Sequence, residues 1–149
     1  MKKRSYKVLV PTDFSEISRH AIQYVLSQFH GQVSHLIVLN AYPENEPGSA
    51  PLISLVDILK ERAERMLLKE TEILNKLEFA EGVEIVGIAK FDGFLNAMKQ
   101  VTQEEEIDLV VIGTNGETHP KIEAREDDPL YLLHQIGKPL FLVPQFAPL

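Results

Sequence analysis

The sequence contains no cysteine, and its basic side chains are outnumbered by acidic ones. Without cysteine, disulfide bonds, thiolate metal sites and cysteine nucleophiles are excluded together. The 22 acidic and 15 basic residues give a formal net charge of −7. This balance disfavours nucleic-acid binding, which depends on neutralising phosphates with Lys and Arg. No run of apolar residues approaches the roughly 18 of a membrane-spanning helix, so no membrane segment is predicted.

The length and composition are those of a globular protein with one core. The 149 residues are 44% apolar and 25% charged, and they predict a single domain over residues 1–149. The basic amino terminus runs straight into a strand-like segment, without the apolar region and cleavage site of a secretory signal. We therefore expect a cytoplasmic protein.

Apolar runs and helical periodicities alternate along the chain. The strands are predicted at residues 6–11, 33–41, 82–89, 107–112 and 138–144. The helices are predicted at residues 17–28, 52–77, from 94 to the acidic run 104–106, and 129–135. All strands except the third are near-continuous apolar runs, a pattern typical of a buried parallel sheet. We expect an α/β fold of three α/β/α layers, with a five-stranded, mainly parallel, Rossmann-like sheet.

The topological switch point of such a sheet is where a ligand is expected, at the carboxyl ends of the first and fourth strands. Pro11-Thr12-Asp13 follows the first strand, and Gly113-Thr114-Asn115-Gly116 follows the fourth. Glycines at a strand end let main-chain N–H groups approach a phosphate, but they also allow a tight turn without any ligand. Asp13 has two interpretations as well, because it is placed either to contact a ligand or to cap the helix that follows.

Three segments resemble the universal stress protein family in their order and spacing: VLVPTDFS at residues 8–15, DLVVIGTNG at 108–116 and PLFLVP at 139–144. The resemblance implies an adenine nucleotide alpha hydrolase-like architecture. In ATP-binding members the Asp after the first strand lies near adenine and ribose, and Gly-x-x-Gly, nine residues and Gly-Ser or Gly-Thr hold the phosphates. The implied site for ATP or AMP, which we call the candidate nucleotide pocket, comprises Thr12, Asp13, Ala41, Gly113, Asn115 and Gly116.

The second part of the implied phosphate motif is replaced by acidic residues. Glu126-Asp127 stands where the family pattern has Gly-Ser or Gly-Thr. Pro129 suits the first position of a helix, which makes Asp128 or Asp127 the expected N-cap, so a carboxylate already occupies the helix end that would attract an anion. A triphosphate would meet like charges there, and we expect ATP to be held poorly. The acidic segment matches no calcium-loop spacing, and the histidines show no ligand pairing, so no metal site is predicted.

No catalytic residues are predicted, since neither a Gly-x-Ser-x-Gly elbow nor a Walker-type phosphate loop is present. The first functional hypothesis is a stress-response or signalling module that forms a homodimer through the apolar last strand, residues Leu140, Phe141, Leu142 and Val143. Family members commonly dimerise there. The second hypothesis is an ATP- or AMP-binding protein with slow or no turnover. A third, a nucleotide-dependent transferase, rests on fold analogy alone.

Overall fold

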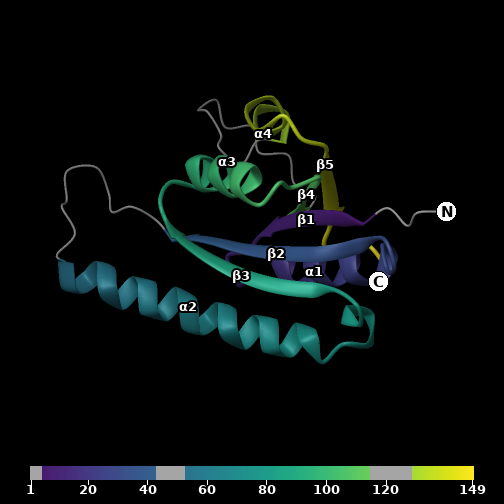
Figure 1. Ribbon diagram of the computed structural model, residues 1–149, viewed down its shortest axis with the longest axis horizontal. Coiled ribbons are helices and arrows are strands. Elements are labelled where there is room, and N and C mark those ends of the chain that lie inside the picture. The colour runs from purple at the N-terminus through teal and green to yellow at the C-terminus, as the bar shows by residue number, and fades with distance from the viewer. Residues whose placement is uncertain (1–4, 43–52, 115–128) are drawn as a thin grey trace.

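The computed structural model describes residues 5–42, 53–114 and 129–149, in which helices and strands alternate (Figure 1). The elements in chain order are β1 (Tyr6–Pro11), α1 (Glu16–Gln28), β2 (Val33–Tyr42), α2 (Ile53–Asn75), the 3₁₀ turn η1 (Glu78–Ala80), β3 (Glu84–Phe91), α3 (Phe94–Glu104), β4 (Leu109–Thr114), α4 (Pro129–Ile136) and β5 (Leu140–Pro144). The predicted order of strands and helices is confirmed, and η1 is an addition. Residues 115–128 lie outside the described residues. The predictions made for them, which concern a calcium loop, the cap of the fourth helix and the phosphate motif, are therefore not addressed by the structure.

The five strands form one sheet in the order β3-β2-β1-β4-β5, and each neighbouring pair is parallel. The expected α/β class and Rossmann-like parallel sheet are therefore confirmed. Apolar strands suit this arrangement because both faces of a parallel sheet are covered by helices. The order also confirms that β5 is an edge strand and that β1 and β4 are neighbours at the switch point.

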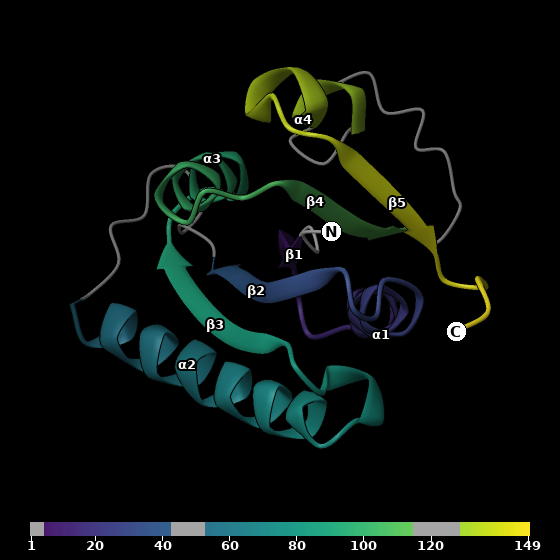
Figure 2. The ribbon, with the colours of Figure 1, turned by 45° about the vertical axis from the view of Figure 1, so that its right-hand side comes forward.

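Helices cover the sheet on both faces (Figure 2). One buried cluster joins the sheet to α1 and α2, and it includes Ile22, Leu26 and Leu67. A second cluster joins the other face to α3 through Ala97, Met98 and Val101. No helix of the described ranges is long and apolar enough to cross a membrane.

Strands β1 and β4 are paired over a short stretch that joins the middle of β1 to the start of β4. The ladder consists of Val8 opposite Leu109 and Leu9 opposite Val110. By contrast, β1 stays paired with β2 as far as Pro11, opposite Leu39. The carboxyl ends of β1 and β4 are thus less tightly tied to one another than the carboxyl ends of β1 and β2, as expected at a switch point.

Candidate functional site

The structure places the candidate residues at the carboxyl ends of three neighbouring strands. Thr12 and Asp13 follow β1, Ala41 is the penultimate residue of β2, and Gly113 is the penultimate residue of β4. The β1–β4 register, continued along both strands, sets Thr12 level with Gly113. Asn115 and Gly116 lie outside the described residues, as do Glu126 and Asp127.

Thr12 is buried and takes part in several hydrogen bonds within the protein. Its Oγ1 accepts a hydrogen bond from the N–H of Phe14 at 2.9 Å and lies 3.0 Å from Ser18 Oγ. Its carbonyl oxygen accepts from Asn40 Nδ2 at 2.8 Å. Thr12 therefore fixes the turn after β1, and its hydroxyl is engaged before any ligand arrives.

Asn40 and Ser18 belong to this network, although neither was predicted from the sequence. Asn40 lies near the end of β2, and its side chain ties β2 to the turn after β1. Ser18 is buried in the first turn of α1. A polar residue at the end of an otherwise apolar strand is the signal that would have identified Asn40, because buried polar groups need partners.

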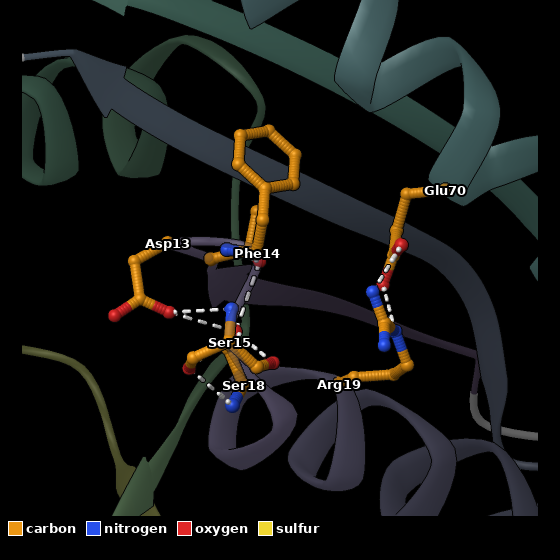
Figure 3. A network of polar contacts seen from close by, with 7 residues as sticks. Asp13, Phe14, Ser15, Ser18, Arg19 and Glu70 are labelled. Carbon is orange, nitrogen blue, oxygen red and sulfur yellow. Dashed lines mark hydrogen bonds and ion pairs between the residues drawn. The ribbon is translucent and has the colours of Figure 1, made fainter.

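Asp13 is exposed, and one of its oxygens is used by the chain (Figure 3). Oδ1 accepts hydrogen bonds from the N–H of Ser15 at 2.9 Å and from Ser18 Oγ at 3.1 Å. The other carboxylate oxygen points away from both serines in Figure 3. Asp13 thus combines a fixed orientation with one carboxylate oxygen directed away from its protein partners.

The helix cap at this position is Ser15, so the interpretation of Asp13 as the N-cap of α1 is wrong. Ser15 has extended backbone angles, and its Oγ accepts from the N–H of Ser18 at 3.3 Å. Phe14, between the two residues, has a φ of 66°, in the left-handed region that bulky residues rarely adopt. This turn separates Asp13 from the helix, which begins at Glu16, and Asp13 instead accepts from the N–H of its cap.

The hydrogen bonds around Ser18 have a consistent direction. Ser18 Oγ lies within reach of Thr12 Oγ1, Asp13 Oδ1 and the carbonyl oxygen of Ser15. A hydroxyl carries one proton, so Ser18 donates either to the carboxylate or to the carbonyl and accepts from Thr12, whose own oxygen accepts from a main-chain N–H. The hydroxyls therefore form a relay that ends on Asp13 or on the Ser15 carbonyl.

The pKa of Asp13 follows from these contacts. Partial burial alone would raise it, but the hydrogen bonds from Ser15 and Ser18 outweigh that effect and hold the pKa below its ordinary value. Asp13 is consequently ionised at neutral pH. A carboxylate of this kind accepts hydrogen bonds from hydroxyl or amine groups and repels phosphate.

Gly113 lies inside β4 rather than in the turn that the sequence predicted. Its φ is outside the left-handed region, and it pairs with Val143 of β5. A Cβ added at Gly113 would stand 2.6 Å from the carbonyl oxygen of Ile17 in α1, closer than real contacts allow. Close packing of α1 on β4 is therefore sufficient to require glycine here.

An ion pair ties the start of α1 to α2 beside the turn (Figure 3). Arg19 Nε donates to Glu70 Oε1 at 3.0 Å, and Nη2 donates to Oε2 at 3.3 Å. Glu70 is buried, and its hydrogen bonds and charge raise the pKa of Arg19. The pair adds α2 to the elements that hold the amino terminus of α1 in place.

Ala41 contributes little side-chain chemistry to the candidate site. It is partly buried, packs against the α3-side core and pairs with Lys90 of β3. Within the described ranges, no group of three or more His, Asp and Glu residues is arranged to hold a metal ion. The described part of the site is therefore an oriented carboxylate supported by hydroxyl groups, an arrangement able to bind hydrogen-bond donors.

Comparisons with known proteins relate the whole fold to one family. The model of the Universal stress protein family matches residues 5–143. No curated protein matched the chain in a sequence comparison. A crystal structure of a universal stress protein family member from Burkholderia pseudomallei superimposes with a TM-score of 0.67 at 20% identity, covering 93% of this chain and 96% of the other.

Two further similar structures contain nucleotides. A universal stress protein in complex with cAMP has a TM-score of 0.67 at 16% identity, with 97% of this chain and 99% of the other covered. A family protein from Arabidopsis thaliana with AMP bound has a TM-score of 0.62 at 14% identity, with 95% and 93% covered. At such identities the likeness concerns the fold, whereas the family model spans nearly the whole chain. The chain therefore belongs to the universal stress protein family.

Proposed function

We propose that this protein is a cytoplasmic stress-response or signalling module that acts as a homodimer and holds ATP poorly. It has no catalytic role in this proposal. The observation that carries the proposal is the packing around Gly113, where a Cβ would stand 2.6 Å from the Ile17 carbonyl oxygen. Because helix packing already accounts for this glycine, its presence is not evidence for a phosphate site.

The sequence supplies the second reason to expect weak ATP binding. Glu126 and Asp127 occupy the positions at which the family pattern has Gly-Ser, and Asp128 follows them. Carboxylates at these positions repel the β- and γ-phosphates. They also stand in place of the small residues that would let main-chain N–H groups approach the phosphates. The proposed pocket is thus degenerate at its phosphate end, with Asp13 retained at the other end.

Calorimetric titration with ATP tests this proposal. We expect a dissociation constant of about 1 mM or weaker, equivalent to a binding free energy of about −4 kcal/mol or less favourable. No ATP should be released when the purified protein is denatured. Stoichiometric binding at micromolar ATP would overturn the proposal.

The double substitution Glu126→Gly with Asp127→Ser tests the cause of weak binding. It restores the Gly-Ser pair of the family pattern, and we expect ATP affinity to rise at least about tenfold, or roughly 1.4 kcal/mol. The substitution pair Glu104→Gly with Glu105→Ser is the matched control, because it also removes two adjacent acidic charges, at the end of α3. An equal gain in both variants would mean that net charge alone limits binding.

AMP or cAMP binding is the second candidate function. Asp13 favours it, because an oriented, ionised carboxylate suits ribose hydroxyls or the adenine amine, and two similar structures contain AMP and cAMP. These ligands place fewer charges near residues 126–128. Titration of AMP, repeated with Asp13→Asn, tests this function: tighter binding of AMP than of ATP, weakened by the substitution, would support it, and equal affinities would contradict it.

The homodimer is proposed to form through β5. This edge strand exposes Leu142, which is 40% exposed, and Phe146 just after the strand is 76% exposed. Leu130 and Leu133 of the neighbouring α4 are also exposed, so apolar side chains extend beyond the strand. Exposed apolar edges favour pairing with another strand.

Analytical ultracentrifugation tests this interface. The chain has a mass of 16.8 kDa, and we expect a species of at least about twice that mass, whose association Leu142→Lys should weaken by placing a charge in the β5 interface. Ile58→Lys in α2 is the control, since Ile58 is more exposed than Leu142 and the charge change is the same. Association that is as strong in Leu142→Lys as in the wild-type protein would contradict this assignment.

A further inference from the structure

The opposite edge of the sheet is formed by β3, the last strand beyond β2. Its eight residues, Glu84 to Phe91, pair on one side with residues 35–42 of β2. Within the described ranges no other main-chain hydrogen bond reaches β3. The outward N–H and C=O groups of β3 therefore form a long template on which another strand can pair.

A hollow lies over the middle of this edge, between α2 and β3. Its volume is about 440 Å³, and Leu67, Leu68, Thr71 and Gly87 contribute to its lining. Leu67 packs closely over Gly87, where a Cβ would lie 3.2 Å from Leu67 Cβ, and Leu68 is exposed beside the hollow. An apolar side chain and an unfilled space are thus adjacent at the midpoint of the strand.

The charges of β3 are arranged symmetrically about the same midpoint. Glu84 precedes Gly87 by three residues, and Lys90 follows it by three. Val86 and Ile88 pack into the α3-side core, whereas Ile85 and Ala89 pack into the α1–α2 core, so the even-numbered residues share the α3 face. Glu84 and Lys90 therefore lie on one face of the strand, at equal distances from its centre.

We propose that β3 is a second self-association edge, which pairs antiparallel with β3 of another copy about a two-fold axis at Gly87. In this register, Glu84 of each copy is directly opposite Lys90 of the other, and both charge pairs are complementary. Val86 is opposite Ile88 on the same face. Directly opposite residues of antiparallel strands interact most strongly, and opposite charges there stabilise the pair.

The same two-fold axis accounts for the hollow and for Leu68. A Cβ on Gly87 would lie 3.2 Å from Leu67 Cβ, so the centre of β3 is directly beneath this part of α2. Rotation about Gly87 brings α2 of the second copy alongside, with Leu68 of each copy near the hollow of the other. The exposed leucine and the unfilled space then cover one another.

Existing contacts of the two charged residues leave room for the proposed pairs. Lys90 Nζ is 3.8 Å from Glu104 Oε2, a long contact that allows a second carboxylate to approach. Glu84 contacts His35 Nε2 at 2.9 Å, but its side chain is largely exposed. Because His35 and Glu104 differ from the proposed intermolecular partners, internal and intermolecular charge pairs can be separated by substitution.

Charge exchange provides the main test, by sedimentation equilibrium of the full-length chain. All variants carry Leu142→Lys, so that association through β5 does not contribute, and the test holds whether or not β5 forms a dimer. Glu84→Lys alone places two lysines opposite each other, and Lys90→Glu alone places two glutamates opposite each other. We expect each single substitution to weaken association roughly tenfold.

The combined substitution Glu84→Lys with Lys90→Glu should restore association to near its starting strength. It restores opposite charges between copies, but within one copy it places a lysine beside His35 and a second glutamate beside Glu104. Recovery therefore cannot come from the internal pairs. Circular dichroism checks that each variant is folded, and failure of the double variant to recover would overturn the proposal.

Cysteine crosslinking provides an independent measurement, because the chain has no cysteine of its own. Leu68→Cys should be joined to a second copy by a short bismaleimide crosslinker. Ile58→Cys is the matched control, since the exposed fractions are 59% and 60% and Ile58 lies on the same helix, about 15 Å away along its axis. Equal crosslinking of both variants would contradict a two-fold axis at Gly87.

A monomer at every concentration in the Leu142→Lys background would also overturn the proposal, and the β3 edge would then be open to an extended segment of a different protein.

If both edges associate, β5 and β3 contacts alternate and the sheet continues from copy to copy. Wild-type protein would then exceed the mass of a dimer as its concentration rises, whereas each single charge variant would stop at the dimer.

Discussion

The carboxyl ends of β1 and β4 hold the same helix terminus by opposite means. At β1, polar side chains make hydrogen bonds: Thr12 bonds the Phe14 N–H and contacts Ser18, and Asp13 bonds the Ser15 N–H. At β4, Gly113 contributes no side chain, and α1 approaches the strand through the Ile17 main chain. The end of β1 depends on polar side-chain atoms, and the end of β4 depends on the absence of any side chain at Gly113.

This difference shows that residues of a ligand-site pattern also have structural tasks. Thr12 and Gly113 are both needed to position α1, and neither requires a ligand to explain its identity. Asp13 differs from both, because one of its carboxylate oxygens points away from its protein partners in Figure 3. Among the described candidates, Asp13 is the side chain with capacity left for a ligand.

Gly113→Ala should cause the largest loss of stability, because the new Cβ would meet a main-chain oxygen that cannot move independently. Overpacking of this kind costs about 1–3 kcal/mol, or roughly 2–4 °C of melting temperature per kcal/mol. Thermal unfolding provides the measurement. Gly87→Ala in β3 is the control and should lose less, since its contact is 3.2 Å from a side-chain atom. Equal losses would mean that glycine has the same role in both strands.

Thr12→Val tests the opposite case at β1, where a polar atom is required. The substitution keeps the shape but removes the hydroxyl that accepts from Phe14, and we expect a loss of about 1–3 kcal/mol, nearer the lower limit. Thr102→Val is the matched control, because Thr102 is similarly buried and its Oγ1 has no hydrogen-bond partner among the residues that the structure describes. Urea denaturation should show little change for the control; a comparable loss there would mean that the Thr12 hydrogen bonds contribute nothing.

Ser15→Ala should have a smaller effect, since it removes one helix cap and leaves Thr12 and Asp13 in place. The expected loss is about 1 kcal/mol in the free energy of unfolding. Ser27→Ala near the end of α1 serves as the control, because Ser27 caps nothing and its hydroxyl donates to the Tyr24 carbonyl within the helix. If the Ser15 variant were as stable as wild type in urea, the cap would carry no weight in holding α1.

Asp13→Asn should have the smallest effect, and that effect should depend on pH. The pKa of Asp13 is lowered in the folded protein, so the charged carboxylate stabilises the fold above its unfolded pKa of about 3.9, and this contribution is lost as the pH falls through the lower folded pKa. The stability difference between wild type and variant should therefore be present at pH 7 and shrink below about pH 4. Urea titrations from pH 7 to pH 3 measure it; a difference independent of pH would contradict the assignment.

The alternation of strands and helices could be predicted because each has a strong periodic signal. The near-continuous apolar run at residues 107–112 and the long amphipathic pattern of α2 are examples. Element ends were predicted less well: β4 extends through Gly113 to Thr114, and η1 was not predicted. Strand ends depend on pairing with a neighbour, and Gly113 stays in β4 because it pairs with Val143 of β5.

The candidate site shows a similar division. The positions of Thr12, Asp13 and Gly113 at neighbouring strand ends follow from strand order and the switch-point rule. The capping-box spacing of Asp13 and Glu16 made Asp13 a candidate for the cap as well as for a ligand contact, but Phe14 adopts a left-handed turn that makes Ser15 the cap. A short capping pattern fits more than one register, and only packing of the turn against the core selects one.

The sequence by itself determined the class of fold, the order of strands and helices along the chain and the absence of cysteine chemistry, because composition and apolar periodicity act locally along the chain. Only the tertiary structure decided how individual residues are used. Gly113 is explained by the distance between β4 and α1, Thr12 by its burial among polar partners, and the open edge of β3 by the place of that strand at the end of the sheet. These properties depend on contacts between segments far apart in the chain, which no local pattern specifies.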